Sequence, residues 1–532
     1  MRTWSPERLI HRLETAVAAQ RPSFTAAFMT VHSLRGMVED YPELAGKRTA
    51  QALDVLLGQT CYTRQTQALA FYREVSHALA AILMHAVDSE VFESALAILK
   101  KFTAKTDGVR QRAAAEALGC LPLHIRGPEI ERTPAENIPE VPFCRMAEAA
   151  PMRGNPKILG RSIVWDIDGI EGVFVVKQAG SNSALDGLRK EIEWMRYLRR
   201  TNTDVGEPFH VPKPCGFCDS YIVKPVGLPA TIKKRLPANG TGAIAFIAHK
   251  NYFSYPNPTE ASRRLGREDF AAVIKGNART LGRLTRMGII HTAPIPLFHN
   301  RTQQSRRHDN GIYDWPRGGR LDQWLQSCRF PNFGISGIRD FEHLKAFTGP
   351  DQLLYRHIGT QLMSLVLVAG SWFRNAAPHL RGFDEAGNPV DARDLFDPVY
   401  YKKLLIDMYT SYYRGFVGRP FNGELPADLN RLTDRLIEEM GCDRDMVEVF
   451  RIADQLALSD FECERFLRRK GFSLDERAAF KKGVRDVTIH SGPHLGYFNG
   501  RISIPELITF LAGASAFCIA DAFCQSRWTT FS

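Results

Sequence analysis

The sequence predicts an α+β protein in which a helical N-terminal domain precedes a small β-rich lobe and a large helical lobe. Apolar residues recur at helical spacing over residues 1–125 and again from Asp269 onward, whereas two short β-rich runs joined by a glycine-containing turn lie between these regions. With 532 residues, of which 44% are hydrophobic and 24% charged, the chain has enough apolar material for two or three cores.

Residues 1–125 are predicted to be helical throughout. A helix from Asp88 carries Phe92 and Leu99 on one face, and an Ala-rich helix follows the turn at 105–108. Paired amphipathic helices of this kind stack in HEAT-like arrays, but the repeat has no strict period, so a plain helical bundle fits equally well. In either form we expect this domain to serve as a docking domain or as a structural support, because its sequence contains no recognisable set of catalytic residues.

Closely spaced prolines over residues 126–156 exclude a long helix and predict a linker. The rest of the chain then divides into a core at 157–420 and a helical C-terminal extension at 421–532. Ten scattered cysteines, together with a charged start that lacks an apolar signal segment, predict a cytoplasmic protein with reduced thiols. No apolar run is long enough to span a membrane, so we expect no membrane span.

The β-rich runs Ser162–Ile167 and Val173–Gln178 predict a hairpin whose second strand ends in Val-Val-Lys, at Lys177. In the helix that follows, Glu191 comes fourteen residues after this lysine. A strand lysine fixed by a helix glutamate can hold the α- and β-phosphates of ATP. Each residue alone could equally be a solvated charge. Glu193 is an alternative partner, because helical register separates the two glutamates only weakly.

A second motif follows a long amphipathic helix. There an apolar segment runs into His291, a proline-containing loop and Asn300, and Asp314 stands fourteen residues further on. An amide oxygen and a carboxylate from neighbouring loops are hard ligands that suit Mg²⁺ bound to phosphate. The order of these residues resembles the catalytic segment of protein kinases. We therefore predict a catalytic site formed by Lys177, Glu191, Asn300 and Asp314. In this site Asn300 and Asp314 would hold the magnesium ion.

The chain departs from the kinase pattern at three points. Ala293 stands where phosphorylating kinases have the aspartate that accepts the substrate's hydroxyl proton, and a methyl group cannot act as a base. One glycine lies beside Arg161 where a phosphate loop would have three; we assign Arg161 itself to nucleotide binding. Asp314 is followed by Trp-Pro instead of Phe-Gly. Five arginines surround it: Arg301, Arg306, Arg307, Arg317 and Arg320.

These motifs resemble those of the SidJ-related pseudokinases, an atypical kinase-fold family of protein glutamylases. The resemblance covers about residues 155–420 and rests on Lys177, Glu191 and the segments His291–Asn300 and Tyr313–Gly319. It implies a bilobal, protein-kinase-like core with ATP and Mg²⁺ as cofactors. It also implies protein glutamylation, in which an acceptor carboxylate of a protein substrate is adenylylated and free glutamate then displaces AMP to form an isopeptide bond.

Other functions stay open. A carboxylate acceptor is already ionised at neutral pH, so the first step of glutamylation needs no base at Ala293, and we favour this reaction. A protein AMP-transferase would use the same first step. A catalytically inert nucleotide-binding scaffold would explain the missing base and glycines. A true kinase would need another carboxylate, such as Asp309, in the cleft.

The expected partners follow from charge and from the resemblance. Much of the net charge of +11 gathers near the nucleotide cleft, so we expect a protein substrate and free glutamate as partners and no nucleic acid. The family prototype is activated by calmodulin through an IQ-type helix, and Arg414–Arg419 matches the latter half of that motif. A helix end before Pro420 explains the same residues, so we do not expect a calmodulin-like activator.

Overall fold

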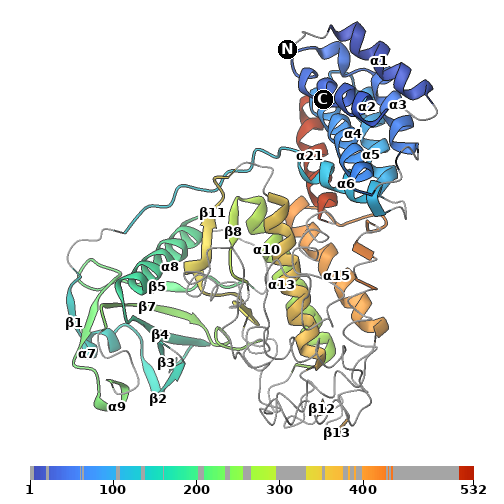
Figure 1. Cartoon of the computed structure of the whole chain (residues 1–532). Coiled ribbons are helices and arrows are strands. Elements are labelled where there is room, and N and C mark those ends of the chain that lie inside the picture. The colour runs from blue at the N-terminus through green and yellow to red at the C-terminus, as the bar shows by residue number, and fades with distance from the viewer. Residues whose placement is uncertain are drawn as a thin grey trace, which may run out of the picture.

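The chain is described from a computed structural model. It describes residues 5–19, 23–59, 62, 65–103, 108–133, 138–159, 161–201, 209–233, 240–255, 265–294, 331–349, 354–374, 382–383, 389–390, 398–426, 429–430, 433–434 and 515–531. Over these ranges the predicted α+β class is confirmed, with helical and sheet-containing regions that are separate in space (Figure 1). No helix in the same ranges combines the length and the apolar character that crossing a bilayer requires.

The N-terminal region of the described chain is built from helices. They are α1 (Pro6–Ala18), α2 (Phe24–Met37), η1 (Pro42–Leu44), α3 (Lys47–Gly58), α4 (Gln65–His85), α5 (Ser89–Thr103) and α6 (Gly108–Gly119). Ser5 caps α1, because its hydroxyl accepts the backbone N–H of Arg8 and Pro6 occupies the first turn. Apolar side chains at helical spacing, such as Phe92 and Leu99, are buried between the helices. Stacking as HEAT repeats stays a prediction.

A five-stranded antiparallel sheet in the order β2-β3-β4-β7-β5 forms the β-rich region. Its strands are β2 (Met152–Leu159), β3 (Ser162–Ile167), β4 (Gly172–Ala179), β7 (Gly242–His249) and β5 (Lys213–Cys215). The predicted hairpin is the β3–β4 pair, in which Ser162 lies opposite Lys177. The long helix α8 (Asn182–Arg200) lies along the sheet (Figure 1). Central strand β4 is therefore buried along its whole length.

Between α6 and the sheet the described chain is mostly extended, in agreement with the proline spacing. Two short elements interrupt it: β1 (Glu140–Pro142), which pairs in parallel with β6 (Lys224–Val226), and α7 (Phe143–Ala147). A further short helix, α9 (Ala230–Lys233), follows β6. The sheet starts with β2 at Met152, inside the range 126–156 that the sequence assigns to a linker.

The second helical region contains the long helices α10 (Arg267–Arg286), α13 (Leu354–Arg374) and α15 (Pro398–Val417). α10 and α15 lie in backbone contact, because a Cβ on Gly282 or on Gly415 would overlap the main chain of the other helix. α15 ends at Val417, and Gly418 has the left-handed φ of 87° that commonly follows a helix end, as the residues before Pro420 predict.

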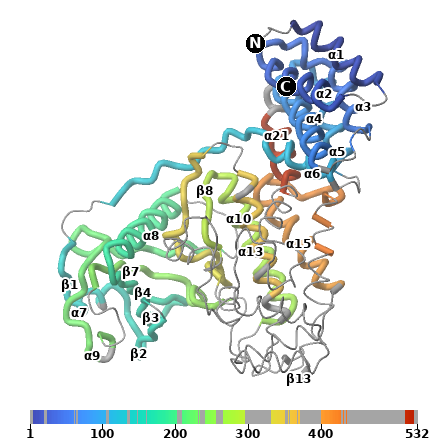
Figure 2. Tube along the Cα trace, in the orientation of Figure 1, coloured from blue at the N-terminus to red at the C-terminus, as the bar shows by residue number. Residues whose placement is uncertain are grey.

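Short strands lie between these helices along the chain. They are β8 (Ile289–His291), β9 (Phe333–Gly334), β10 (Gly337–Ile338), β11 (Leu344–Ala346), β12 (Gly382–Phe383) and β13 (Pro389–Val390), with the 3-10 turn η4 (Phe341–His343) before β11. β8 pairs with β11, and β9 with β10. Helix α21 (Ala516–Phe531) returns to the N-terminal region and packs between α6 and α15 (Figure 2).

Candidate functional site

Lys177 lies on the central strand β4, with its side chain on the face that α8 covers. Alternate residues of a strand point to opposite faces of the sheet. Val173 and Val175 belong to the large core that includes the apolar face of α8, whereas Phe174 and Val176 belong to a smaller core on the other side. The alternation therefore directs Lys177 toward α8. Only 7% of its side chain is exposed, and a buried ammonium group is stable only when it is paired.

Two carboxylates pair with Lys177. Its Nζ donates hydrogen bonds to Oε2 of Glu191 at 2.7 Å and to Oδ1 of Asp340 at 2.9 Å. Glu191 comes from α8 and is fully buried, so the two residues that the sequence pairs are ion-paired in the structure. Glu193, the alternative partner, binds elsewhere, because its Oε1 accepts the backbone N–H of Thr133 at 2.6 Å.

Asp340 reaches Lys177 from 163 residues further along the chain. It follows the β9–β10 hairpin and has a left-handed backbone, with φ 50° and ψ 60°, which aspartate tolerates better than most residues. Sequence analysis missed this residue, although two signals mark it. Asp340 is followed by Phe, as in the kinase Asp-Phe-Gly segment, and Asn332 stands eight residues before it.

A second ion pair lies beside the first. Arg161, which immediately precedes β3, pairs with Glu342, which lies in η4 two residues after Asp340. Glu342 fits against α8 because residue 187 is a glycine, and a Cβ at Gly187 would overlap the carboxylate. Its side chain is 11% exposed and that of Arg161 31%. Two cations and three carboxylates therefore converge between β4, α8 and η4.

Burial and mutual charge shift the pKa values of these groups. Burial alone would lower the pKa of Lys177, but Asp340 and Glu191 outweigh it and raise this pKa to about 12. For Glu191 burial prevails over the attraction of Lys177 and raises the pKa to about 7. Burial would also raise the pKa of Asp340, but Lys177 and Arg339 hold it far below its usual range. The lysine is thus firmly charged, whereas one of its partners titrates near neutrality.

His291 supports the segment that carries Asp340. Its Nε2 lies 3.1 Å from the carbonyl oxygen of Arg339, and its Nδ1 accepts the backbone N–H of Ala293 at 3.3 Å. Burial lowers the pKa of His291 to about 4, so the imidazole is neutral and Nε2 is the nitrogen that donates. Ala293 is buried, and its carbonyl accepts the side-chain N–H of Asn332 at 2.8 Å. Four residues from two segments that are distant in sequence thus form one hydrogen-bonded unit beside the Lys177 site.

Asn300 and Asp314, the predicted magnesium ligands, lie outside the described residues. So do the five arginines around Asp314. Within the described ranges no three His, Cys, Asp or Glu side chains are grouped as a metal cage would require. Magnesium does not need such a cage, because it is usually held by one or two carboxylates together with phosphate oxygens and water. Asp340 fits that requirement, since 36% of its side chain is exposed.

None of the models of known protein families matches the chain, and no curated protein is significantly similar to it in sequence.

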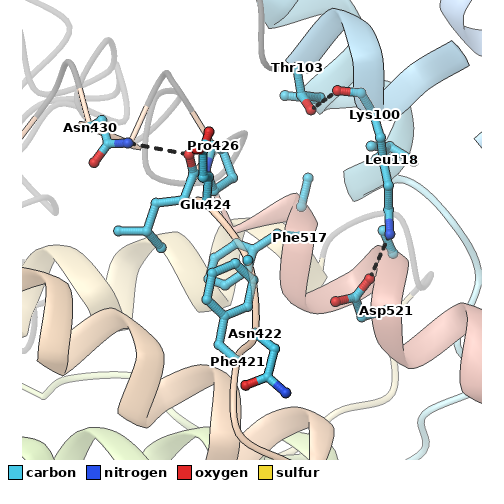
Figure 3. Close-up of a pocket in the computed structure, with 15 residues that line it drawn as sticks. Lys100, Thr103, Leu118, Phe421, Asn422, Glu424, Pro426, Asn430, Phe517 and Asp521 are labelled. Atoms are coloured by element: carbon cyan, nitrogen blue, oxygen red, sulfur yellow. Dashed lines mark hydrogen bonds and ion pairs between the residues drawn. The ribbon is translucent and has the colours of Figure 1, made fainter. Parts of the chain in front are cut away.

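A separate cavity of about 310 Å³ lies where α5 and α6 meet α21 and the segment after α15 (Figure 3). Its apolar wall includes the rings of Phe421 and Phe517, which pack edge to face. Lys100 reaches across from α5 to Asp521 on α21 at 3.1 Å, and Tyr413 donates a hydrogen bond to the same carboxylate at 2.8 Å. Lys100, Tyr413 and Asp521 are thus paired with one another, and Glu424 is a further charged residue in the cavity lining.

Proposed function

We propose that the protein binds Mg²⁺ and ATP at the Lys177 site of a kinase-like bilobal core and uses them to glutamylate an acceptor carboxylate on a protein. The observation that carries the proposal is the position of Lys177 between Glu191 and Asp340. A lysine held by a helix glutamate can bind the α- and β-phosphates, and an aspartate at contact distance can hold the metal that accompanies them. A purely structural ion pair would need one carboxylate, and here the lysine has two.

The order of residues along the chain supports a kinase-like core. In protein kinases a strand lysine is followed by a helix glutamate, a histidine-containing loop, an asparagine and an Asp-Phe-Gly segment. The same order is found here in Lys177, Glu191, His291, Asn332 and Asp340. We assign to Asn332 and Asp340 the magnesium ligation that spacing alone assigns to Asn300 and Asp314. A glutamate, Glu342, replaces the glycine of the kinase segment.

Each described group then has a role in binding. Lys177 and Arg161 carry the positive charge that would hold phosphate oxygens, and both already bind carboxylates in the same place. Asp340 and Asn332 supply hard oxygen atoms for Mg²⁺, which neutralises phosphate charge when it is bound. Glu191 keeps Lys177 directed into the site, because its position on α8 is fixed by packing of Leu188 and Ile192.

The proposed reaction has two balanced steps. In the first, an oxygen of the acceptor carboxylate attacks the α-phosphorus of ATP, the bond to the β-phosphate oxygen breaks, and pyrophosphate leaves from an acyl-adenylate. In the second, the amino group of free glutamate, after losing its ammonium proton to solvent, attacks the acyl carbon, a second proton passes from the nitrogen to solvent, and AMP leaves with the former carboxylate oxygen. The product is an isopeptide bond. Both steps bring anions together, so positive charge at Lys177 and Arg161 favours each transition state.

The residues near Ala293 support a carboxylate as the acceptor. A hydroxyl acceptor needs a base, whereas a carboxylate is ionised at neutral pH. The side chain of Ala293 is a buried methyl group, and the neighbouring imidazole of His291 is engaged at both nitrogens. Among the described residues of this loop no group is placed to remove a hydroxyl proton.

Nucleotide binding is tested by thermal unfolding. With 1 mM ATP and 5 mM Mg²⁺ we expect a rise in Tm for the wild type, since saturation at roughly 100 times Kd stabilises a protein by about 2.7 kcal/mol. Lys177→Ala and Asp340→Asn should lose the rise, whereas Lys100→Ala, which changes a lysine paired elsewhere, should keep it. A wild-type Tm that does not respond to Mg²⁺ and ATP contradicts every ATP-dependent function.

Labelled substrates separate the possible reactions. With labelled glutamate, ATP and a cell lysate as acceptor source, glutamylation predicts label in protein together with release of AMP and pyrophosphate. Label from the α-phosphate that stays on protein would indicate an AMP-transferase, and transfer of the γ-phosphate would indicate a kinase. Nucleotide binding without any transfer would favour an inert scaffold. Each of the last three outcomes overturns glutamylation.

A further inference from the structure

The extended segment 121–133 links the N-terminal helices to the sheet region, and it is anchored along its length. Figures 1 and 2 show it leaving α6 and running toward the sheet region on the side where α8 lies. Leu121, Leu123 and Ile125 are buried in the main core, although the segment has no regular secondary structure. A passive linker would expose such side chains, so this segment is part of the folded unit.

Its first backbone anchor is at Phe347 and Gly288, which directly follow β11 and directly precede β8. The N–H of Gly127 donates to the carbonyl of Phe347 at 2.9 Å, and the N–H of Phe347 donates to the carbonyl of Gly288 at 2.7 Å. A Cβ on Gly127 would lie 2.5 Å from Gly288 O and from Phe347 N, so only glycine fits. Phe347 directly follows β11, which begins four residues after Asp340. The anchor therefore holds the strand that continues from Asp340.

The second anchor is on α8. The backbone N–H of Thr133 donates to Oε1 of Glu193 at 2.6 Å in a buried setting, two residues from Glu191. Near the end of the helix Glu131 pairs with Arg200 at 2.7 Å, and this pair is exposed. The buried Thr133–Glu193 contact fixes the helix more firmly than the exposed Glu131–Arg200 pair. Breaking the buried contact would leave the desolvated carboxylate of Glu193 without a hydrogen-bond donor.

We propose that residues 126–133 form a strap that sets the distance between Glu191 and Asp340 across Lys177, with Gly127 and Glu193 as its positioning residues. Lys177 and Arg161 attract Glu191, Asp340 and Glu342, whereas the three carboxylates repel one another. These opposing charges do not fix how far apart α8 and η4 lie, and a segment anchored to both sides does. One end of the strap fixes the strand after Asp340, and the other fixes the helix that carries Glu191. The N-terminal helices continue directly into it, so that domain is coupled to the site.

This proposal does not rest on nucleotide binding, and its test uses no nucleotide. The full-length protein is treated with acetic anhydride, and acetylation of Lys177 is followed by peptide mass spectrometry. In the wild type we expect Lys177 to react more slowly than Lys100, because it is buried and held protonated by two carboxylates. Gly127→Ala should raise the rate at Lys177 at least fivefold. Gly36→Ala, at a helical position with nothing within 4 Å, should leave it unchanged.

Variants at Glu193 distinguish a positioning role of this residue from a general destabilisation of the fold. Glu193→Ala removes the acceptor for Thr133 and should raise the acetylation rate at Lys177 and speed hydrogen exchange in α8. Glu193→Gln keeps an acceptor oxygen and should restore both rates to within twofold of the wild type. Equal rates at Lys177 in the wild type and in a folded Glu193→Ala protein overturn the proposal. It is also overturned if Glu193→Gln behaves like the alanine variant, and this arm holds even if Gly127→Ala fails to fold.

Discussion

Two of the lysine–aspartate ion pairs in the described part of the chain, Lys177–Asp340 and Lys100–Asp521, join segments far apart in sequence and differ chiefly in burial. Lys177 pairs with Asp340 at 2.9 Å and Lys100 pairs with Asp521 at 3.1 Å, so their geometry is similar. Half of the Lys100 side chain is exposed, against 7% for Lys177. The buried lysine has a second carboxylate, Glu191, whereas the exposed one shares its aspartate with a neutral hydroxyl.

The difference shows how burial changes what an ion pair does. At the surface, water stabilises each charge separately, so the pair adds little and its loss is cheap. In the interior each charge depends on its partners, and removing one partner leaves the others uncompensated. The Lys177 site therefore holds its charges at a cost to stability, which is a feature of sites that bind charged ligands. The Lys100 site has the character of a structural contact between α5 and α21.

The largest expected effect follows from Lys177→Met. Methionine fills a similar volume but leaves Glu191 and Asp340 without a cation, so the free energy of unfolding at pH 7 should fall by about 3–5 kcal/mol. Urea unfolding followed by circular dichroism measures it. The loss should shrink at pH 5, because protonation of the carboxylates relieves their repulsion. A decrease in the free energy of unfolding of less than about 1 kcal/mol at pH 7 would mean that Lys177 behaves like Lys100, as an exposed ion pair does.

Part of this site could be predicted from local sequence. The strand that carries Lys177 and the helix that carries Glu191 are adjacent in the chain, so the kinase-like pattern of a strand lysine and a helix glutamate is enough to propose the pair, although helical periodicity leaves Glu193 as an alternative. Asp340 is separated from Lys177 by 163 residues, and its side chain is directed by a left-handed backbone that no periodicity encodes. Spacing counted onward from His291 leads instead to Asn300 and Asp314.

A smaller effect concerns the pH dependence that Glu191 confers. Its pKa is raised to about 7 in the folded protein from an ordinary 4.5, so between these values the folded state keeps a proton that the unfolded chain has lost. The stability of the wild type relative to Glu191→Gln should therefore fall as pH rises from 4.5 to 7, by up to about 3 kcal/mol. Urea unfolding of both proteins at pH 5, 6, 7 and 8 measures the difference. A difference that rises with pH would mean that Lys177 outweighs burial.

The strap illustrates what sequence patterns leave out. The proline spacing of residues 126–156 correctly excludes a long helix, but it carries no information about what the segment contacts. Its anchors are a backbone N–H of Thr133 and a backbone N–H of Gly127. Every residue other than proline has such a group, so composition cannot reveal the contact. The close packing at Gly127 and the buried partner Glu193 on α8 are therefore seen only in the structure.

At the Lys100–Asp521 pair we expect the hydroxyl of Tyr413 to contribute more to the free energy of unfolding than the charge of Lys100. Tyr413 is buried, and its O–H donates to the carboxylate of Asp521 at 2.8 Å. Tyr413→Phe leaves one oxygen of that carboxylate without its donor, so we expect a loss of about 1–2 kcal/mol in the free energy of unfolding. Chemical denaturation at pH 7 measures it. The comparison of the two sites fails here if Tyr413→Phe costs less than removal of Lys100.

The smallest expected effect is that of Lys100→Met. The lysine is half exposed, so water replaces Asp521 as its partner, and the free energy of unfolding should change by less than about 1 kcal/mol. The change should decrease further in 1 M NaCl, where charges are screened within about 3 Å. Lys177→Met provides the contrast in the same buffers, because screening by salt hardly reaches a buried pair. If both variants respond to salt alike, burial does not distinguish the two lysines, and the charged site is more open to solvent than its 7% exposed lysine indicates.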